Sequence, residues 1–428
     1  TAAKEVCFII FPPHNKQNTR SNHSSYWKMN SLKQLYKDIK TSWGKKFRWI
    51  TAFFLLWIYR TIFMPAGDGG FAQALQIISL FSMLFIVYSH WQRKVVGIFR
   101  ISNPPIRTLL LLYFYALLSA TWAFMPAFSA FLSIQNFILM ALTFWLLSMP
   151  KTFDGVEKSL VYLIMAMAFF SAIGGRYNVG WPIFIHLLQT GTCSAMCFAY
   201  CFAEWIKEKK DKKRLRFFRT VMLISFVLLV TSTSSGANAS CVAGIGTAML
   251  FSGHAMWGAL MACIGIFAFI YQDQLMDLLL LIMPGKTKAT IESATGRDRL
   301  WEQILYFAAQ KPMFGWGFAC AERVVSVKGT VLSPDAHNNY IGFYGSLGYA
   351  GCVLAALHFV TSLFSFFKNS LKRGYLGLMC AMVVALVNGY SYGFLSGKAC
   401  VITIAYFAII VAGYHFKRAQ RLEQLIRR

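Results

Sequence analysis

Long apolar stretches recur along this chain at near-regular intervals, and no other feature restricts its possible folds so strongly. About twelve of them approach the ~20 residues that an α-helix needs to cross the hydrocarbon core of a bilayer. Only 14% of the residues are charged, against about 25% in a soluble domain. The sequence therefore predicts an all-α fold, a polytopic membrane helix bundle. The predicted spans are 49–64, 71–89, 108–124, 131–149, 160–174, 183–202, 217–233, 237–251, 256–271, 338–367, 375–389 and 399–416.

The net charge of +26 is placed unevenly with respect to these spans. Most of the 42 Lys and Arg residues fall on one side of the predicted membrane, whereas the 16 acidic residues divide about evenly. This is the positive-inside pattern, so it predicts that both termini are cytoplasmic. The basic run 207–219 is then a topology anchor beside anionic membrane lipids rather than a nucleic-acid-binding patch. The predicted cytoplasmic segments are 1–48, 90–107, 150–158, 204–219, 368–373 and 417–428.

The same topology divides the chain into five parts. A basic cytoplasmic segment, 1–48, precedes the first nine spans in 49–283. A large periplasmic loop, 284–336, separates them from the last three spans in 337–416, and 417–428 is a basic cytoplasmic tail. The loop has about fifty residues, and loops of that length are usually either functional or disordered.

The large loop is predicted to carry an amphipathic helix. Apolar residues fall at helical spacing and give one apolar stripe, and Thr295 with Asp298 resembles a capping box. Pro312 and the glycines Gly315 and Gly317 are expected to end this helical region. The residues of the stripe are Leu300, Trp301, Ile304, Leu305 and Ala308.

Three arginines are predicted to lie on the outer face. Arg297 and Arg299 fall in the first turn of the loop helix, where cations are mildly unfavourable unless an anion docks beside them. Lipid headgroups offer an equally good alternative, because long basic side chains extend along apolar surface to reach them. Arg176 follows the fifth span on the same face.

One titratable ring joins this basic surface. Ser333, Pro334 and Asp335 have the residue types of a helix start, which predicts that His337 lies in the first turn of the tenth span. A polar cluster at such a position is expensive unless it lines a cavity. Two chemistries are not expected here. The chain has neither an Asp-x-Asp metal site nor a Cys-x-x-Cys pair, so no metal is predicted, and the absence of a Walker-type loop argues against ATP-driven action.

Motifs in this region resemble the O-antigen ligase and O-antigen polymerase superfamily. The loop contains Gly296-Arg297-x-x-Leu300-Trp301 and Pro312-x-x-Gly315-x-Gly317, followed by His337-Asn338-x-Tyr340 and Gly348-x-x-Gly351. The sequence Leu118-Ser119-Ala-Thr-Trp122-x-x-x-Pro126 is also similar to this superfamily. One departure concerns a turn where many members have Ser-Arg-Gly-Ala, because this chain has Ser234-Ser235-Gly236-Ala237.

The resemblance implies a membrane glycosyltransferase of the bacterial inner membrane that works at its periplasmic face without metal, nucleotide or other cofactor. The donor would be a glycan linked to undecaprenyl diphosphate, and the acceptor a hydroxyl of lipid A–core or of another glycan. It makes His337 the general base and Arg176 and Arg297 the diphosphate clamps. Arg299 is a further candidate for diphosphate binding, and Asn338, Tyr340 and Trp301 are candidate supporting residues.

Two other classes of protein remain open from the sequence. A lipid-linked-sugar transporter would need charged or broken helices near mid-membrane, and only Arg60 and His358 are candidates for such groups. A receptor or scaffold protein would not need a basic outer cluster. Glycan transfer is therefore favoured, with a ligase preferred over a polymerase.

Overall fold

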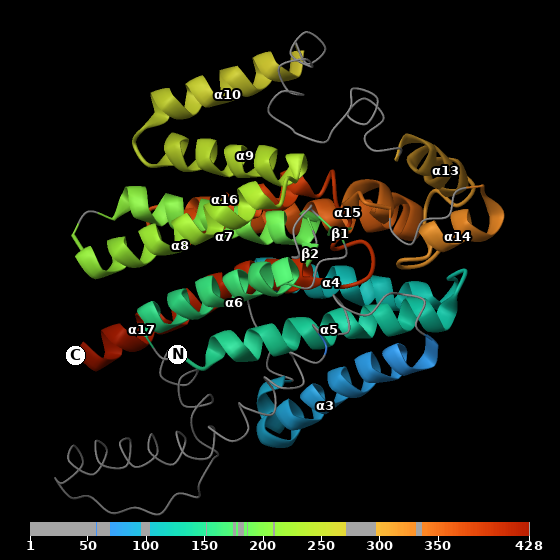
Figure 1. Ribbon diagram of the computed structural model, residues 1–428. Helices are drawn as coiled ribbons and strands as arrows, with labels where there is room; N and C mark the ends of the chain where they lie inside the picture. The colour runs from blue at the N-terminus through green and yellow to red at the C-terminus, as the bar shows by residue number, and fades with distance from the viewer. Residues whose placement is uncertain are drawn as a thin grey trace, which may run out of the picture. The chain divides into compact units, whose positions relative to one another are not determined.

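The computed structural model describes Trp57 and the ranges 69–95, 103–150, 152–173, 177–178, 184–185, 187–208, 210–270, 297–330 and 336–427. Almost all of these residues are helical (Figure 1). Segment 1–48 and Arg176 lie outside them, as does the first predicted span except for Trp57. The helices are α3 (Gly69–Val95), α4 (Pro104–Leu118), α5 (Pro126–Ser148), α6 (Phe153–Ile173), α7 (Leu187–Lys207), α8 (Lys212–Thr231), α9 (Ser235–Phe251), α10 (Ala255–Ile270), α13 (Asp298–Ala308), α14 (Ala321–Lys328), α15 (Asn339–Lys368), α16 (Tyr375–Asn388) and α17 (Val401–Arg427).

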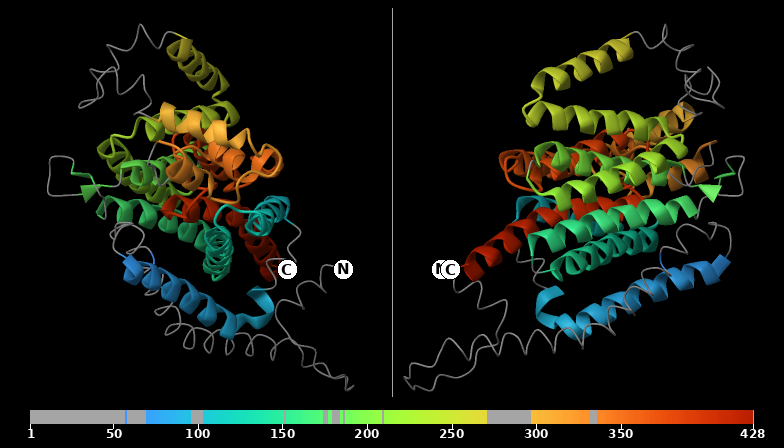
Figure 2. Two further views of the ribbon diagram at one scale, coloured as in Figure 1. Left: turned by 90° about the vertical axis from the view of Figure 1, so that its right-hand side faces the viewer. Right: turned by 60° about the vertical axis from the view of Figure 1, so that its left-hand side comes forward.

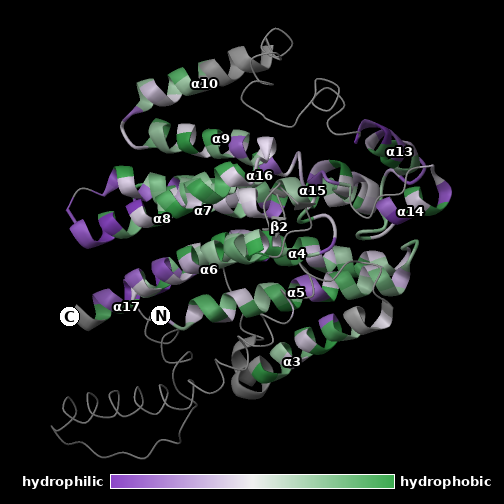
Figure 3. Cartoon of the chain, in the orientation of Figure 1, coloured by the Kyte–Doolittle hydropathy of each residue, from purple (hydrophilic) through white to green (hydrophobic). Residues whose placement is uncertain are grey.

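Each predicted span from the second to the twelfth coincides with one of these helices. Four helices in the described ranges, α5, α6, α15 and α17, are long and apolar enough to cross a membrane. Apolar residues dominate the helices through most of their length, whereas polar residues concentrate on α13, α14 and the helix ends (Figure 3). The chain is therefore a helical membrane protein, and the count of about twelve spans stays a prediction.

The described residues include one pair of β-strands. Two-residue strands β1 (Tyr177–Asn178) and β2 (Phe184–Ile185) pair antiparallel between α6 and α7. Such a short pair closes the connection between two neighbouring helices without forming a sheet that could pack a core.

Helix α15 bends sharply at Gly348, which has φ 65° and ψ −163°. The rings of Tyr340 and Phe343 on the short limb before the bend lie 6.3 and 6.5 Å from the ring of Phe359 on the long limb. In a straight helix Tyr340 and Phe359 would be about 28 Å apart. The predicted single span 338–367 is therefore wrong in shape, because its first limb folds back against its second.

A turn of the large loop explains why the chain bends there. Trp316 N and Gly317 N donate hydrogen bonds to the carbonyl oxygens of residues 345 and 346, and the amides of residues 349 and 350 donate to Pro312 O and Met313 O. A Cβ at Gly348 would lie 2.5 Å from the Met313 carbonyl group, and a Cβ at Gly315 would lie 2.5 Å from the carbonyl group of residue 346. Only glycine permits so close an approach at positive φ, which accounts for Gly315 and Gly348.

The 118–126 motif packs against the same turn. Ser119 Oγ accepts a hydrogen bond of 2.9 Å from Phe318 N, and Trp122 Nε1 donates one of 3.1 Å to Phe314 O. The motifs that are scattered in the sequence are thus gathered at one end of the helices, which we call the loop end. In Figure 1 this end carries α13 and α14, and in the left panel of Figure 2 it faces the viewer.

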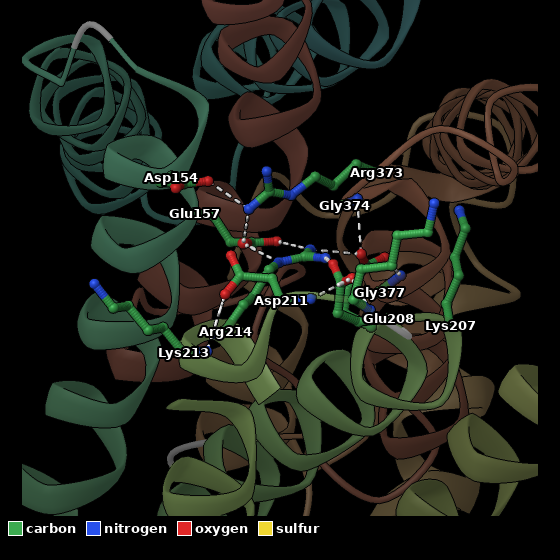
Figure 4. Close-up of polar contacts among 12 residues, drawn as sticks. Asp154, Glu157, Lys207, Glu208, Asp211, Lys213, Arg214, Arg373, Gly374 and Gly377 are labelled. Carbon is green, nitrogen blue, oxygen red and sulfur yellow. Dashed lines mark hydrogen bonds and ion pairs between the residues drawn. The ribbon is translucent and has the colours of Figure 1, made fainter. Parts of the chain in front are cut away.

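A buried ion cluster marks the opposite end of α7 (Figure 4). Arg214 donates to Glu157 Oε1 and Oε2 at 2.6 and 2.8 Å, to Glu204 Oε2 at 2.8 Å and to Glu208 Oε2 at 2.7 Å. Arg373 pairs with Asp154 and reaches Glu157 at 3.6 Å. Burial raises the pKa of Glu208, but the Arg214 guanidinium and two backbone N–H groups outweigh it and lower that pKa to about 2.

The cluster tests part of the predicted topology. Its residues come from three segments that the charge pattern assigns to one side, and Lys207 adds bonds to Ser370 O and Lys372 O. A fourth such segment joins them, since Glu423 accepts from Phe153 N. That these segments lie together at one end of the bundle agrees with the charge pattern, while the compartment stays a prediction.

We expect Arg214→Met to destabilise the protein by about 3–5 kcal/mol, because it leaves buried carboxylates without their cation. The measurement is the thermal unfolding midpoint of the purified protein in detergent. Arg216→Met is the matched control, since Arg216 lies one half-turn further along α8 and is exposed. Equal midpoints for the two variants would show that the cluster contributes little to stability.

Candidate active site

His337 lies just before α15 in a left-handed backbone conformation, with φ 53°. A residue other than glycine there costs about 1–2 kcal/mol, so its surroundings must hold it. Ala336, which is fully buried, donates its N–H to Glu322 Oε1 at 3.2 Å and accepts at its carbonyl from Trp301 Nε1 at 2.9 Å. On the other side of His337, Asn338 is anchored to the helix that follows. The histidine is thus fixed from both directions along the chain.

The predicted helix start is corrected by this arrangement. The N-cap of α15 is Asn338, whose Oδ1 accepts from Tyr340 N at 2.9 Å and Ile341 N at 3.1 Å. His337 therefore precedes the helix instead of occupying its first turn. Asparagine is a preferred N-cap residue, and α15 begins at this asparagine, five residues after the serine that the sequence favoured as the N-cap. Residues 331–335 lie outside the described ranges.

The non-helical turn between α16 and α17 is central to the site, and we call residues 388–396 the 388–396 turn. Asn339 donates its N–H to Gly389 O at 2.7 Å and accepts at Oδ1 from Leu395 N at 2.8 Å. Tyr113, in the middle of α4, donates to Leu395 O at 3.4 Å. Non-helical backbone inside a membrane protein has to be satisfied by such internal partners.

This turn meets His337 through Tyr392. The two ring centroids are 6.0 Å apart at an interplanar angle of 51°. Tyr392 is almost completely buried, and its hydroxyl accepts a 2.9 Å hydrogen bond from Gln189 Nε2 at the start of α7. The imidazole thus lies against an aromatic ring whose position is set by a third helix.

The residue before Tyr392 in the turn, Ser391, contacts Arg297. Arg297 occupies the N-cap position of α13, and its Nη1 donates to Ser391 O at 2.8 Å. Because Ser391 and Tyr392 are adjacent, the turn brings the arginine and the histidine to neighbouring residues. Trp301, one turn along α13, packs its ring 5.5 Å from Tyr390 and completes the link.

Tyr340 and Arg299 are two further predicted site residues whose positions the structure describes. Tyr340 donates its hydroxyl to Leu386 O at 2.7 Å and so ties α15 to α16. Arg299 is exposed on α13. The predicted apolar stripe of α13 is largely confirmed, because Leu300, Ile304 and Ala308 are buried, but Leu305 is 43% exposed.

The position that departs from the family pattern also borders the site. Ser235 is the first residue of α9, and a Cβ at its neighbour Gly236 would collide with Ser391 Oγ. The turn that carries an arginine in many superfamily members thus packs against the residue that binds Arg297 in this chain.

The structure also shows the surroundings of the Cys320 thiol and of His358. Burial raises the pKa of the Cys320 thiol to about 11, so it stays protonated at neutral pH. Within the described ranges, no group of three His, Cys, Asp or Glu residues could hold a metal ion. His358, a candidate transport group, contacts the Thr108 hydroxyl at 3.1 Å and the Tyr406 hydroxyl at 2.6 Å and links three helices.

The central part of the chain resembles a known protein family. Residues 220–356 match a family model described as O-Antigen ligase. This match confirms the resemblance to the O-antigen ligase and polymerase superfamily, and it supports a glycan-transfer function and a membrane-embedded enzyme. The matched range includes Arg297 and His337 but not the 388–396 turn. No curated protein matches the chain.

Proposed function

We propose that this protein is an O-antigen ligase that transfers a glycan from undecaprenyl diphosphate to a hydroxyl of lipid A–core. The observation that carries the proposal is the placement of His337 and Arg297 on adjacent residues of the 388–396 turn. A polymerase, which uses a glycan acceptor, is the alternative with the same chemistry. The active site would face the periplasm, with both termini cytoplasmic.

His337 would act as the general base. An acceptor hydroxyl is a weak nucleophile at neutral pH, and imidazole has a pKa close to the working pH. The hydroxyl oxygen attacks the anomeric carbon of the donor while the ring nitrogen takes the hydroxyl proton. The bond between that carbon and the diphosphate oxygen breaks, and undecaprenyl diphosphate leaves with the electron pair.

The arginines would balance the charge that develops on the leaving group. Guanidinium groups bind phosphate oxygens through two parallel hydrogen bonds. Arg297 is the main candidate, because its guanidinium already lies at the 388–396 turn, and the superfamily resemblance adds Arg176. Arg299, which is exposed on the same helix, would contact the diphosphate at its outer edge. Asn338, Tyr340 and Trp301 would support the site by holding its backbone.

Lipopolysaccharide from a strain that lacks this protein would decide between ligase and polymerase. For a ligase, we expect every polymer-bearing form of lipid A–core to disappear, with the polymer accumulating on its lipid carrier. A single repeat attached to the core would indicate a polymerase instead. A normal profile that responds to neither deletion nor re-expression would contradict the proposed function.

A further inference from the structure

Three aromatic side chains belong to one packed cluster at the loop end, and we call Phe124, Phe128 and Trp316 the aromatic wall. Phe124 and Trp316 meet edge to face with ring centroids 6.3 Å apart, and Phe124 N donates to Trp316 O at 2.8 Å. Cys320 and Val324 form the buried layer against which all three rings pack. The wall therefore joins the start of α5 to the loop before α14.

Three cations lie over this wall. Lys311 Nζ is 4.2 Å and Lys328 Nζ is 4.7 Å from the centroid of the Trp316 ring. Arg323 Cζ is 5.0 Å from the centroid of Phe128. The ammonium groups of Lys311 and Lys328 thus lie close to the same indole ring and therefore close to each other.

No carboxylate in the described part of the chain forms an ion pair with these three cations. The ion pairs of Arg214 and Arg373 lie at the ion cluster, at the other end of α7. Aromatic faces attract cations but do not neutralise them. Among the described residues, the positive charge at the wall is thus not neutralised by an ion pair, and a bound anion would lower the repulsion between its lysines.

The surroundings of the wall indicate which kind of anion fits. Met313 and Phe314 follow Lys311 in the chain and are each 56% exposed. The Met313 and Pro312 carbonyls are bonded to the first residues of the long limb of α15, where Tyr349 and Val353 are exposed. The cations thus lie beside apolar side chains at the end of a helix that is able to cross a membrane. Tryptophan, tyrosine and basic residues are characteristic of this boundary with water.

We propose that Lys311, Arg323 and Lys328 bind the phosphate of an anionic glycerophospholipid headgroup in the membrane leaflet at the loop end. The exposed apolar side chains of Met313 and Phe314 would lie among its acyl chains. The binding would fix residues 311–328, up to the end of α14, at the membrane surface. This inference concerns lipid binding and does not depend on the proposed glycan transfer.

Hydrogen exchange of the full-length protein in lipid nanodiscs tests the proposal. Adding phosphatidylglycerol to phosphatidylcholine should slow amide exchange several-fold in peptides that cover 311–328. The triple variant Lys311→Gln, Arg323→Gln and Lys328→Gln should lose this response. Peptides that cover α13 report whether the loop end is folded, and their exchange should be the same in both proteins.

Two further arms separate the proposal from its alternatives. Lys311→Arg with Lys328→Arg should keep the response, because positive charge is retained. Lys212→Gln, Lys213→Gln and Arg216→Gln remove equal charge near the ion cluster and should leave exchange at 311–328 unchanged. The proposal is wrong if this control variant abolishes the response, if phosphatidylglycerol has no effect, or if inorganic phosphate alone reproduces it.

Discussion

Replacing His337 with asparagine is expected to lower the rate of glycan transfer by about 10²–10⁴-fold, the range for loss of a general base. Asparagine is the informative substitute because it tolerates the left-handed backbone that His337 adopts, with φ 53°. His337→Ala and His337→Gln should lose a similar amount of activity. The measurement is the initial rate of purified protein with a lipid-linked glycan donor and a lipid A–core acceptor.

The pH profile distinguishes a base from a binding group. Wild-type activity should fall as pH drops below the pKa of the imidazole, which is ~6.5 when unperturbed, and the residual activity of His337→Asn should lack this decline. Tyr392→Phe keeps the ring that packs on His337 and removes only the hydroxyl that Gln189 binds, so it should cost much less than Tyr392→Ala. His254→Asn, at an exposed histidine of the α9–α10 turn, is the matched control. A His337→Asn enzyme within a few-fold of wild type at every pH would exclude the base role.

Arg297→Ala is expected to reduce transfer by about 10²–10³-fold, as when one donor to a developing oxyanion is removed. Arg297→Lys should recover only part of the activity, because a point charge cannot reproduce the paired hydrogen bonds of a guanidinium. Arg176→Ala is predicted to have an effect as large as that of Arg297→Ala. The same assay measures these variants at equal protein concentration.

Arg297 also donates to Ser391 O, so its charge has to be separated from its role in holding the turn. Arg297→Gln retains an N–H donor but no charge and should be nearly as impaired as the alanine variant. Arg299→Ala, in the same helix, should show a smaller loss. If Arg297→Gln were as active as wild type, the side chain would act only by positioning the 388–396 turn.

The helices were predictable because a membrane-spanning helix must be long and apolar. Both properties can be read from the residues of the helix itself. The predicted helix in the large loop was confirmed for the same reason, since Leu300, Ile304 and Ala308 repeat at helical spacing and are buried. The choice of N-cap was less certain. Ser333 and Asn338 are both good caps, and local sequence could not show that His337 adopts a left-handed backbone conformation.

The bend of α15 and the 388–396 turn depend on contacts between distant segments. Gly348 could be recognised as a special position, but that its partner is the Pro312–Gly317 turn follows only from the fold. Tyr392 and Gln189 were missed because each is an ordinary residue of its own segment, and they lie 203 positions apart. The tyrosines that flank Ser391 in a short loop were the one available signal.

The backbone hydrogen bonds at the bend of α15 restrict how this region can move during turnover. Four backbone hydrogen bonds join residues 312–317 to residues 345–350, and each contributes about 0.5–1.5 kcal/mol net. A hinged opening of this turn would break them together and separate the close backbone contacts at Gly315 and Gly348. We therefore expect the turn at residues 312–317 to stay in place during turnover and not to open as a lid. Under the proposed function, substrates would therefore enter and leave beside this turn and not through its opening.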